Sequence, residues 1–272
     1  MNERTDPLRV GALPAHTSAS QLVTYASCPR RYAYRYIEHR EPETRGTGMA
    51  LGSAVHSAIA WWFEERAQER TPAIDEVLAV LRADLAAATA HDNMRWRDTE
   101  PAQLAAEAER LVRLFIETSG EMAVNETEVR FDFVIIDPRT GEQMQRPVVG
   151  YFDAELVDGR IVELKTARRA FTAVELRAGL QFNAYRTAAR YLGVDVEVQT
   201  LVRTKKPRLE RVVLPHDREV SRWFMRAAAD IERAILAGTF PPLAGRTCSY
   251  CEYRRACLGI EASEDVADGE AA

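Results

Sequence analysis

The order of hydrophobic and polar positions divides the chain into a helical first half and a mixed second half. Apolar residues recur at helical spacing in four successive segments, residues 18–37, 48–68, 71–90 and 101–119. Ser18 or Ser20 is a suitable N-terminal cap for the first segment, and Pro29 lies near a break or restart. The pattern therefore predicts a run of helices ahead of the first strand.

Alternation of apolar and polar residues predicts strands in the second half. Three strands, over residues 126–136, 147–157 and 160–167, follow one another with the turn sequences DPRTG and DG nearby. The remaining pattern predicts a helix over 173–192, strands over 196–204 and 208–215, and a last helix over 217–238. This order is typical of an α/β domain with a small mixed sheet and a helical insertion ahead of it.

Composition narrows the class of protein. The chain has 272 residues, 46% of them hydrophobic, which is enough for a sizeable core. It has no apolar run of the roughly 18 residues that a membrane span needs, and its start lacks the apolar stretch of a signal peptide. We therefore expect a cytoplasmic protein without a membrane partner. Thiols stay reduced there, so its four cysteines favour a metal site or catalysis over disulfides.

The charge pattern keeps nucleic acid as a candidate partner. The net charge is −5, but residues 259–272 hold five acidic residues and no basic one, so the rest of the chain is neutral. Basic residues gather in the sequence RTKKPRLER, and local potential rather than net charge steers a ligand. We expect Arg203, Lys205, Lys206 and Arg208 to follow DNA phosphates without reading sequence. An ordinary solvated surface is the alternative.

The candidate chemistry lies in GYFDAELVDGRIVELKTA. Asp153 stands on one predicted strand, and Glu163 and Lys165 share one face of the next. The two carboxylates and the backbone carbonyl of Leu164 are hard oxygen ligands suited to Mg²⁺ or Mn²⁺. A lysine beside such an ion can orient or deprotonate a water that attacks a phosphodiester. Lys165 is one of only three lysines against 33 arginines, although a plain surface salt bridge is the alternative.

This segment resembles the catalytic core of the PD-(D/E)XK nucleases, and more narrowly that of the RecB-like nucleases. The resemblance extends to GSAVHSAIA and to QFNAY, which flank the core on either side. It implies a restriction-endonuclease-like fold, with His56 as a further metal ligand beside Asp153, Glu163 and the Leu164 carbonyl. It also implies that Gln181 and Tyr185 join Asp153, Glu163 and Lys165 as catalytic residues. Glu128, on the first predicted strand, is compared with an acidic position of the family.

The cysteines have an unusual distribution. Cys248, Cys251 and Cys257 lie close together, whereas Cys28 lies in SASQLVTYASCPRRY near the other end. This distribution resembles the iron–sulfur subset of the RecB-like nucleases, namely the AddB-type subunits and the CRISPR-associated Cas-four exonucleases. The resemblance implies that the four thiolates hold a 4Fe–4S cluster that joins the two ends of the domain. Zinc is the alternative metal.

These patterns together predict one nuclease domain over residues 18–258, between a flexible N-terminus (1–17) and a disordered acidic tail (259–272). Its expected parts are a helical region (51–120), the catalytic core (124–215), and the last helix with the cysteines (216–258). The implied function is that of a metal-dependent DNA exonuclease acting on single strands or ends. DNA repair, phage DNA processing and CRISPR spacer acquisition are its candidate settings, with a CRISPR integrase or a helicase subunit as candidate partner. The alternatives are a DNA-end-binding subunit with little catalysis and a zinc-stapled scaffold.

Overall fold

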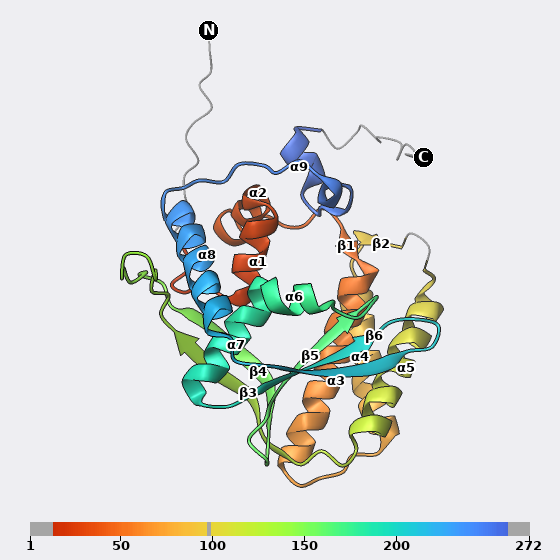
Figure 1. Cartoon of the computed structure of the whole chain (residues 1–272). Helices are drawn as coiled ribbons and strands as arrows, with labels where there is room; N and C mark the ends of the chain where they lie inside the picture. The colour runs from red at the N-terminus through yellow and green to blue at the C-terminus, as the bar shows by residue number, and fades with distance from the viewer. Residues whose placement is uncertain (1–12, 97–98, 261–272) are drawn as a thin grey trace.

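A computed structural model describes residues 13–96 and 99–260. Most of the predicted flexible N-terminus and nearly all of the predicted acidic tail therefore lie outside the described residues. Within them, a single large sheet lies between two groups of helices (Figure 1). No helix of the described ranges is both long and apolar enough to cross a membrane.

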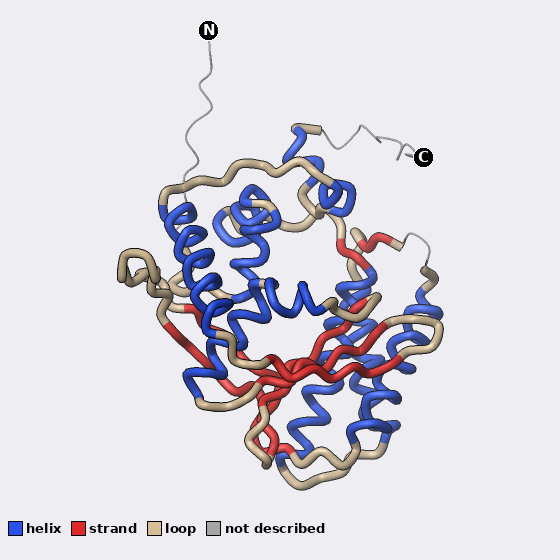
Figure 2. The backbone as a smooth tube through the Cα atoms, viewed as in Figure 1, coloured by secondary structure: helices blue, strands red, loops and turns tan. Residues whose placement is uncertain are grey.

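The large sheet is mixed. Its strands lie in the order β3 (Val124–Phe133), β4 (Val148–Leu156), β5 (Ile161–Ala167), β6 (Val196–Val202) and β7 (Arg208–Leu214). The strands β5 and β6 are parallel, and the other neighbours are antiparallel. Figure 2 shows these strands in red across the molecule, with helices in blue around them. Parallel neighbours need a long crossover, which here is supplied by α6 (Ala173–Ala178) and α7 (Leu180–Leu192). The predicted α/β class with a small mixed sheet is confirmed.

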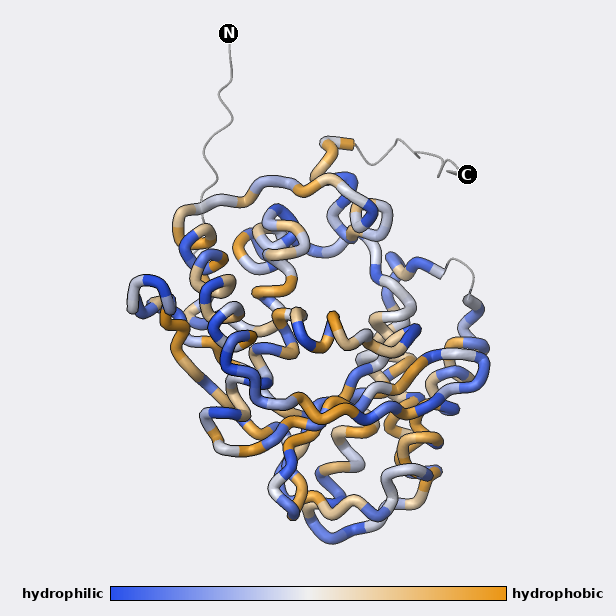
Figure 3. Tube along the Cα trace, viewed as in Figure 1, coloured by the Kyte–Doolittle hydropathy of each residue, from blue (hydrophilic) through white to orange (hydrophobic). Residues whose placement is uncertain are grey.

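Three successive helices lie on one side of this sheet, and the first and third of them contact its strands. They are α3 (Thr47–Ala67), α4 (Ile74–Thr89) and α5 (Pro101–Ser119). Trp62, Phe63 and Phe115 are fully buried where these helices meet, and they belong to the same apolar cluster as Leu164 of β5. Strand β5 therefore rests on the helical region, and the strands across the middle of the molecule are among the hydrophobic segments in Figure 3.

The other face of the sheet is covered by α1 (Ala19–Ser27), α7 and α8 (Arg218–Leu236). Phe131, Phe152 and Phe224 form an aromatic core there with Tyr185 of α7. Strand β6 is buried at every position because both of its faces are covered.

The remaining short elements lie in the connections outside the large sheet and its covering helices. They are α2 (Pro29–Tyr32), the π-helical turn η1 (Ala33–Ile37), β1 (Arg45–Gly46), β2 (Met94–Arg95), the 3₁₀ turn η2 (Arg246–Tyr250) and α9 (Arg254–Leu258). Figure 1 shows α9 near α2 and β1. Arg31 of α2 forms an ion pair with Glu252 at 2.9 Å, and Glu43 accepts hydrogen bonds from the amides of Arg255 and Ala256.

Three local features differ from the pattern-based prediction. The helix expected over 18–37 is divided, because Cys28 is extended (φ −165°) between α1 and α2. The helix expected over 173–192 is divided at Gly179, where an added Cβ would lie 2.6 Å from the Glu175 carbonyl oxygen. Thr17, assigned to the flexible N-terminus, is buried, and its amide donates a hydrogen bond to the Pro147 carbonyl oxygen at 2.9 Å.

Candidate active site

The strands β4 and β5 separate beside the candidate acidic residues. Their ladder contains only the pairs Ala154–Val162 and Glu155–Ile161, whereas β5 stays paired with β6 along its whole length. Beyond that point, the amide of Leu164 donates a hydrogen bond of 2.6 Å to Oδ2 of Asp153. The Asp153 carboxylate thus takes the place of the next backbone acceptor, and this hydrogen bond fixes Asp153 next to β5.

Glu163 and Lys165 lie on the same face of β5, as predicted, and form an ion pair between Nζ and Oε1. The hydroxyl of Tyr185 accepts hydrogen bonds from Lys165 Nζ at 3.4 Å and from Gln181 Nε2 at 3.2 Å. Gln181 and Tyr185 are one turn apart on α7, so both side chains reach the sheet from the same helix face. The structure therefore brings these four predicted residues into one hydrogen-bonded chain.

Burial dominates the electrostatics of this group. It raises the pKa of Glu163 to about 7, although the charge of Lys165 opposes that shift. Burial also favours the neutral amine of Lys165, but the charge and hydrogen bond of Glu163, together with Tyr185 and Asp153, outweigh it and hold the pKa of Lys165 above its usual value. The second carboxylate oxygen of Glu163, Oε2, is buried and has no hydrogen-bond partner. Such an atom is an open acceptor for a water or a cation.

His56 approaches Asp153 from α3. Its Nδ1 lies 3.9 Å from Oδ1 of Asp153, and the two side chains remain 32% and 27% exposed. One turn earlier on α3, an added Cβ at Gly52 would meet no atom within 4 Å. The side of the site that carries His56 is therefore open to a ligand.

The donor atoms fit a divalent cation by type. Among residues 13–96 and 99–260, no group of three or more His, Cys, Asp or Glu side chains is arranged to hold a metal ion. The carboxylates of Asp153 and Glu163 are nevertheless the hard ligands that Mg²⁺ and Mn²⁺ prefer, and Oε2 of Glu163 is unsatisfied. The Leu164 N–H points to Asp153, and the carbonyl of the same strand residue points to the same side.

Glu128 lies on β3, the strand next to β4, at the position opposite Asp153. The β3–β4 register pairs Thr127 with Ala154 and Val129 with Phe152, and Glu128 between them has a left-handed backbone with φ of 49°. A positive φ is uncommon for a residue other than glycine, and it is costly unless the surroundings enforce it. This departure from regular strand geometry next to Asp153 had no signal in the sequence.

The basic run predicted to bind DNA is divided between free and paired side chains. Lys205 and Lys206 are exposed at the turn between β6 and β7, and they make no ion pair with any described residue. Arg203 instead bonds Glu107 at 3.0 Å and its side chain is only 10% exposed. Arg208 pairs with Glu210. The free positive charge of this run is therefore that of the two lysines.

None of the four cysteines forms a disulfide. Burial raises the pKa of the Cys251 thiol, and the neighbouring Cys28 raises it further. Burial likewise raises the pKa of Cys257, with further contributions from Cys28 and Cys248. The remote Cys28 thus lies within electrostatic range of the C-terminal cysteines, but the described residues show no thiolate-ligated metal site.

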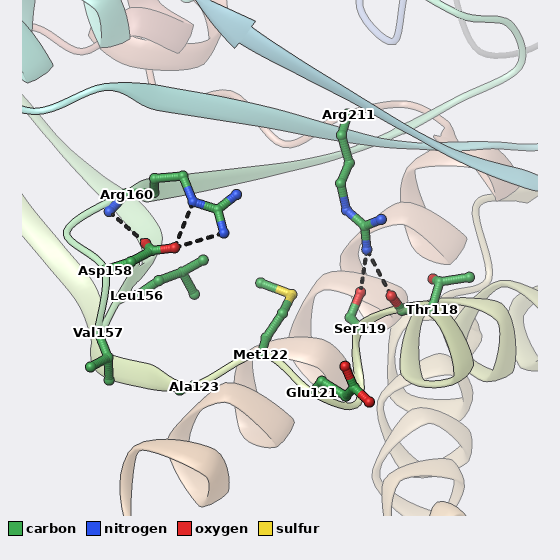
Figure 4. Close-up of a pocket in the computed structure, with 10 residues that line it drawn as sticks. All are labelled: Thr118, Ser119, Glu121, Met122, Ala123, Leu156, Val157, Asp158, Arg160 and Arg211. Atoms are coloured by element: carbon green, nitrogen blue, oxygen red, sulfur yellow. Dashed lines mark hydrogen bonds and ion pairs between the residues drawn. The ribbon is translucent and has the colours of Figure 1, made fainter.

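A separate pocket of about 570 Å³ lies at the opposite end of β5, beside the turn from β4 (Figure 4). Arg160 and Arg211 line it, but both guanidinium groups are already engaged. Arg160 bonds Asp158 and Glu197, and Arg211 bonds the hydroxyl of Ser119. This pocket contains none of the candidate catalytic residues.

The chain matches one protein family over most of its length. The family described as the PD-(D/E)XK nuclease superfamily matches residues 16–258. The crystal structure of a proposed exonuclease from Eubacterium rectale superposes with a TM-score of 0.57 at 13% identity, covering 92% of this chain and 94% of that chain. At this identity the similarity shows a shared fold. The structure of SSO0001 has 16% identity over 82% of this chain and 92% of that chain, but its TM-score of 0.38 supports no argument. No curated protein sequence matches.

Proposed function

The chain belongs to the PD-(D/E)XK nuclease superfamily, and from this premise we propose that it is a metal-dependent DNA exonuclease of the RecB-like group. Its substrate is a single strand or a DNA end. The observation that supports this proposal best is the state of Glu163. One carboxylate oxygen is paired with Lys165, and the other is buried without a partner beside Asp153. A purely structural salt bridge would satisfy both oxygens, because an unpaired buried acceptor is costly.

Asp153, Glu163, His56 and the Leu164 carbonyl would hold the ion, Mg²⁺ or Mn²⁺. When bound, such an ion supplies Lewis acidity toward a phosphate and makes a coordinated water more acidic. Glu163 is the ligand whose charge the fold stabilises least, since burial raises its pKa to about 7. A cation beside it would offset that cost.

The side chains around the acidic pair have distinct tasks in this proposal. Lys165 keeps its proton, because Glu163 holds its pKa above the usual value. It therefore acts as a hydrogen-bond donor that orients water and stabilises developing negative charge, not as a base. Tyr185 and Gln181 fix the direction of the ammonium group, and the Leu164 amide fixes Asp153. Such supporting contacts keep a site in its productive geometry.

The exonuclease assignment is tested with two DNA substrates, a linear strand labelled at one end and a closed single-stranded circle. The proposal expects Mg²⁺- or Mn²⁺-dependent degradation of the linear strand, an intact circle, and full loss of activity with EDTA. Cleavage of the circle would identify an endonuclease. Binding of ends without degradation would favour the alternative of a DNA-end-binding subunit.

We further propose that Cys28, Cys248, Cys251 and Cys257 hold a 4Fe–4S cluster, as in the iron–sulfur subset of RecB-like nucleases, with zinc as the alternative. The convergence of Cys28 with the C-terminal cysteines supports this proposal. A cluster there would close a loop that spans most of the proposed domain over 18–258. Metal-binding free energy would then stabilise the fold.

Iron and sulfide content of anaerobically purified protein tests the cluster. Cys28→Ser is expected to lose both and to melt at a lower temperature, whereas the neighbouring Ser27→Ala keeps them. Colourless protein with stoichiometric zinc would keep a metal site that links Cys28 to the C-terminal cysteines, but it would exclude iron. Unaltered metal content in Cys28→Ser would exclude Cys28 as a ligand of such a site.

The cellular setting is proposed from the substrate. A free DNA end is common to DNA repair, phage DNA processing and CRISPR spacer acquisition, so an enzyme of this type would act in one of these. Its partner there would be a helicase subunit or a CRISPR integrase, the proteins that generate or receive such ends.

A further inference from the structure

A groove lined by arginines lies between the C-terminal segment and the start of α3. This arginine groove has a volume of about 640 Å³ and contains Arg31, Arg95, Arg168, Tyr250, Glu252 and the first turn of α3. Its walls come from five separate parts of the sequence. None of these residues belongs to the candidate catalytic set or to the basic run at the β6–β7 turn.

The arginine groove carries an excess of positive charge. Three arginines face it and Glu252 is its only acidic residue among those described, and Glu252 is already paired with Arg31 at 2.9 Å. Arg168 is exposed and forms no hydrogen bond or ion pair with any described residue. Its guanidinium is therefore available to an anion from outside the protein.

A neighbouring pocket continues the same surface. It has a volume of about 340 Å³ and shares three residues with the arginine groove. It adds three arginines, Arg35, Arg40 and Arg45, and one acidic residue, Glu41. The guanidinium of Arg40 lies 4.9 Å from the ring centroid of Tyr34. Tyr34 is buried, so this contact fixes the position of the Arg40 guanidinium and adds no stacking surface.

The catalytic strand connects the arginine groove to the candidate active site. Arg168 follows Lys165 by three residues, which is about 10 Å along an extended chain. The amide of Arg203 bonds the Ala167 carbonyl oxygen at 2.7 Å, and Arg203 Nη1 lies 3.3 Å from an added Cβ at Gly48. The end of β5 and the start of α3 therefore meet.

Helix α3 also places the arginine groove to one side of the candidate site. His56 lies eight residues after Gly48 on α3, which is about 12 Å along the helix axis. Both elements thus put the groove on one side of the candidate site, at a separation of about three stacked nucleotides.

We propose that the arginine groove binds the phosphates of the DNA strand that occupies the active site, about three nucleotides from the scissile bond. Arg168 contacts a phosphate, since a guanidinium fork matches phosphate geometry. The ring of Tyr250, which is 71% exposed, stacks on a base. The groove is bounded on opposite sides by α3 and by the C-terminal segment, so its ligand is a single strand. This inference rests on the proposed nuclease function.

The C-terminal segment positions one wall of the groove. The side chain of Arg95 donates a hydrogen bond of 3.3 Å to the Ser249 carbonyl oxygen, next to Tyr250. Tyr250 itself lies between Cys248 and Cys251 in the sequence. The cysteine-bearing segment therefore sets the position of the proposed stacking residue.

Fluorescence anisotropy with a labelled single-stranded oligonucleotide, in EDTA, tests the groove without cleavage. Arg168→Gln is expected to weaken binding about three- to tenfold and to reduce the slope of log K against log salt by about 0.7. Arg168→Lys should restore most of that slope. Tyr250→Ala is expected to weaken binding about fivefold or more with little change in slope, and Tyr250→Phe should bind like the wild type.

Arg222→Gln is the matched control, because Arg222 is also an exposed arginine without an ion pair in the described ranges, but on α8. It should leave the affinity and the slope unchanged. The groove assignment is overturned if Arg168→Gln behaves like the wild type. Equal losses in Arg168→Gln and Arg222→Gln, or no binding of the single strand by the wild type, also overturn it.

Cleavage measurements separate this inference from the proposed function. With metal present, Arg168→Gln should raise KM while kcat at saturating DNA stays within about twofold, because the residue contributes binding and no chemistry. A wild-type protein that binds the strand through Arg168 but never cleaves it would contradict the nuclease proposal and leave the groove intact. A variant that loses kcat at unchanged affinity would contradict the groove.

Discussion

Lys165 and Glu163 share a buried ion pair in which the lysine keeps its proton. Burial alone would favour the neutral amine, but Glu163, Tyr185 and Asp153 together outweigh it and the pKa of Lys165 stays above its usual value. The ammonium also donates a hydrogen bond to the Tyr185 hydroxyl at 3.4 Å. The sequence left open whether Lys165 orients or deprotonates a water. The protonated state favours the first of these roles.

Replacement of Lys165 tests this role. In Lys165→Met, kcat for DNA cleavage should fall about a hundredfold or more. The substitution removes the positively charged hydrogen-bond donor that stabilises negative charge in the proposed reaction. Affinity for DNA in EDTA should change little. Lys205→Met, which removes an exposed lysine at the β6–β7 turn, should keep the wild-type kcat. A melting curve verifies folding, and a kcat within twofold of the wild type in Lys165→Met would contradict the role.

At this scale the sequence predicted which residues share a strand face better than which residues make contact. The spacing of Glu163 and Lys165 on a strand was enough to place both on one face. No local pattern could indicate that Arg203 is bonded to Glu107, which lies 96 residues away. The same holds for the arginine groove, which combines Arg31, Arg95 and Arg168 from separate segments.

The helices and strands largely follow the periodicity of apolar residues. Helix α5 spans Pro101–Ser119, as the pattern predicts, because a single apolar face packs on the sheet. The breaks at Cys28 and Gly179 were missed, because the flanking segments keep helical periodicity across them. Periodicity reports which face is buried, and a change of helix direction leaves that signal almost intact.

Gly150 in the GYFD segment is explained by a contact across the sheet. It is paired with Phe131 on β3, and an added Cβ would lie 2.4 Å from the ring of Phe131. Gly150→Ala should therefore destabilise the protein by about 1–3 kcal/mol, because the ring belongs to a packed aromatic core. Urea unfolding measures this change.

Gly52→Ala is the matched control. An added Cβ there meets no atom within 4 Å, and the residue is inside α3. Helix propensity predicts a stabilisation of about 0.5–1 kcal/mol. Equal stability of Gly150→Ala and the wild type would show that the Phe131 ring moves aside without cost.

At the scale of the whole molecule, the fold is closed by contacts between its two ends. Arg146 forms a buried ion pair with Glu232 of α8, with both oxygens bonded at 2.9 Å, and its Nη1 donates to the Pro14 carbonyl oxygen at 3.4 Å. Tyr25 of α1 bonds the Thr239 carbonyl oxygen at 2.6 Å. The sequence indicated this closure only through the placement of its cysteines, because contacts between chain ends leave no periodic signal.

Removal of Arg146 tests this closure. Arg146→Met should lower the free energy of unfolding by about 3–5 kcal/mol, since Glu232 is left buried and unpaired. The double variant Arg146→Met/Glu232→Met should regain most of the loss, because no charge remains buried. Identical stabilities of the single and double variants would show that the pair is not what closes the fold.

The most direct test of the central claim is metal-dependent cleavage of an end-labelled DNA strand by the wild type and by Glu163→Gln, measured side by side. Glu163→Gln keeps the shape of the side chain but removes the charge of the acidic oxygens beside Asp153. The wild type should degrade the strand with Mg²⁺ or Mn²⁺ and stop in EDTA. Glu163→Gln should be at least about a hundredfold slower at unchanged DNA affinity. Full activity of Glu163→Gln, or cleavage by the wild type in EDTA, would contradict the assignment of this site.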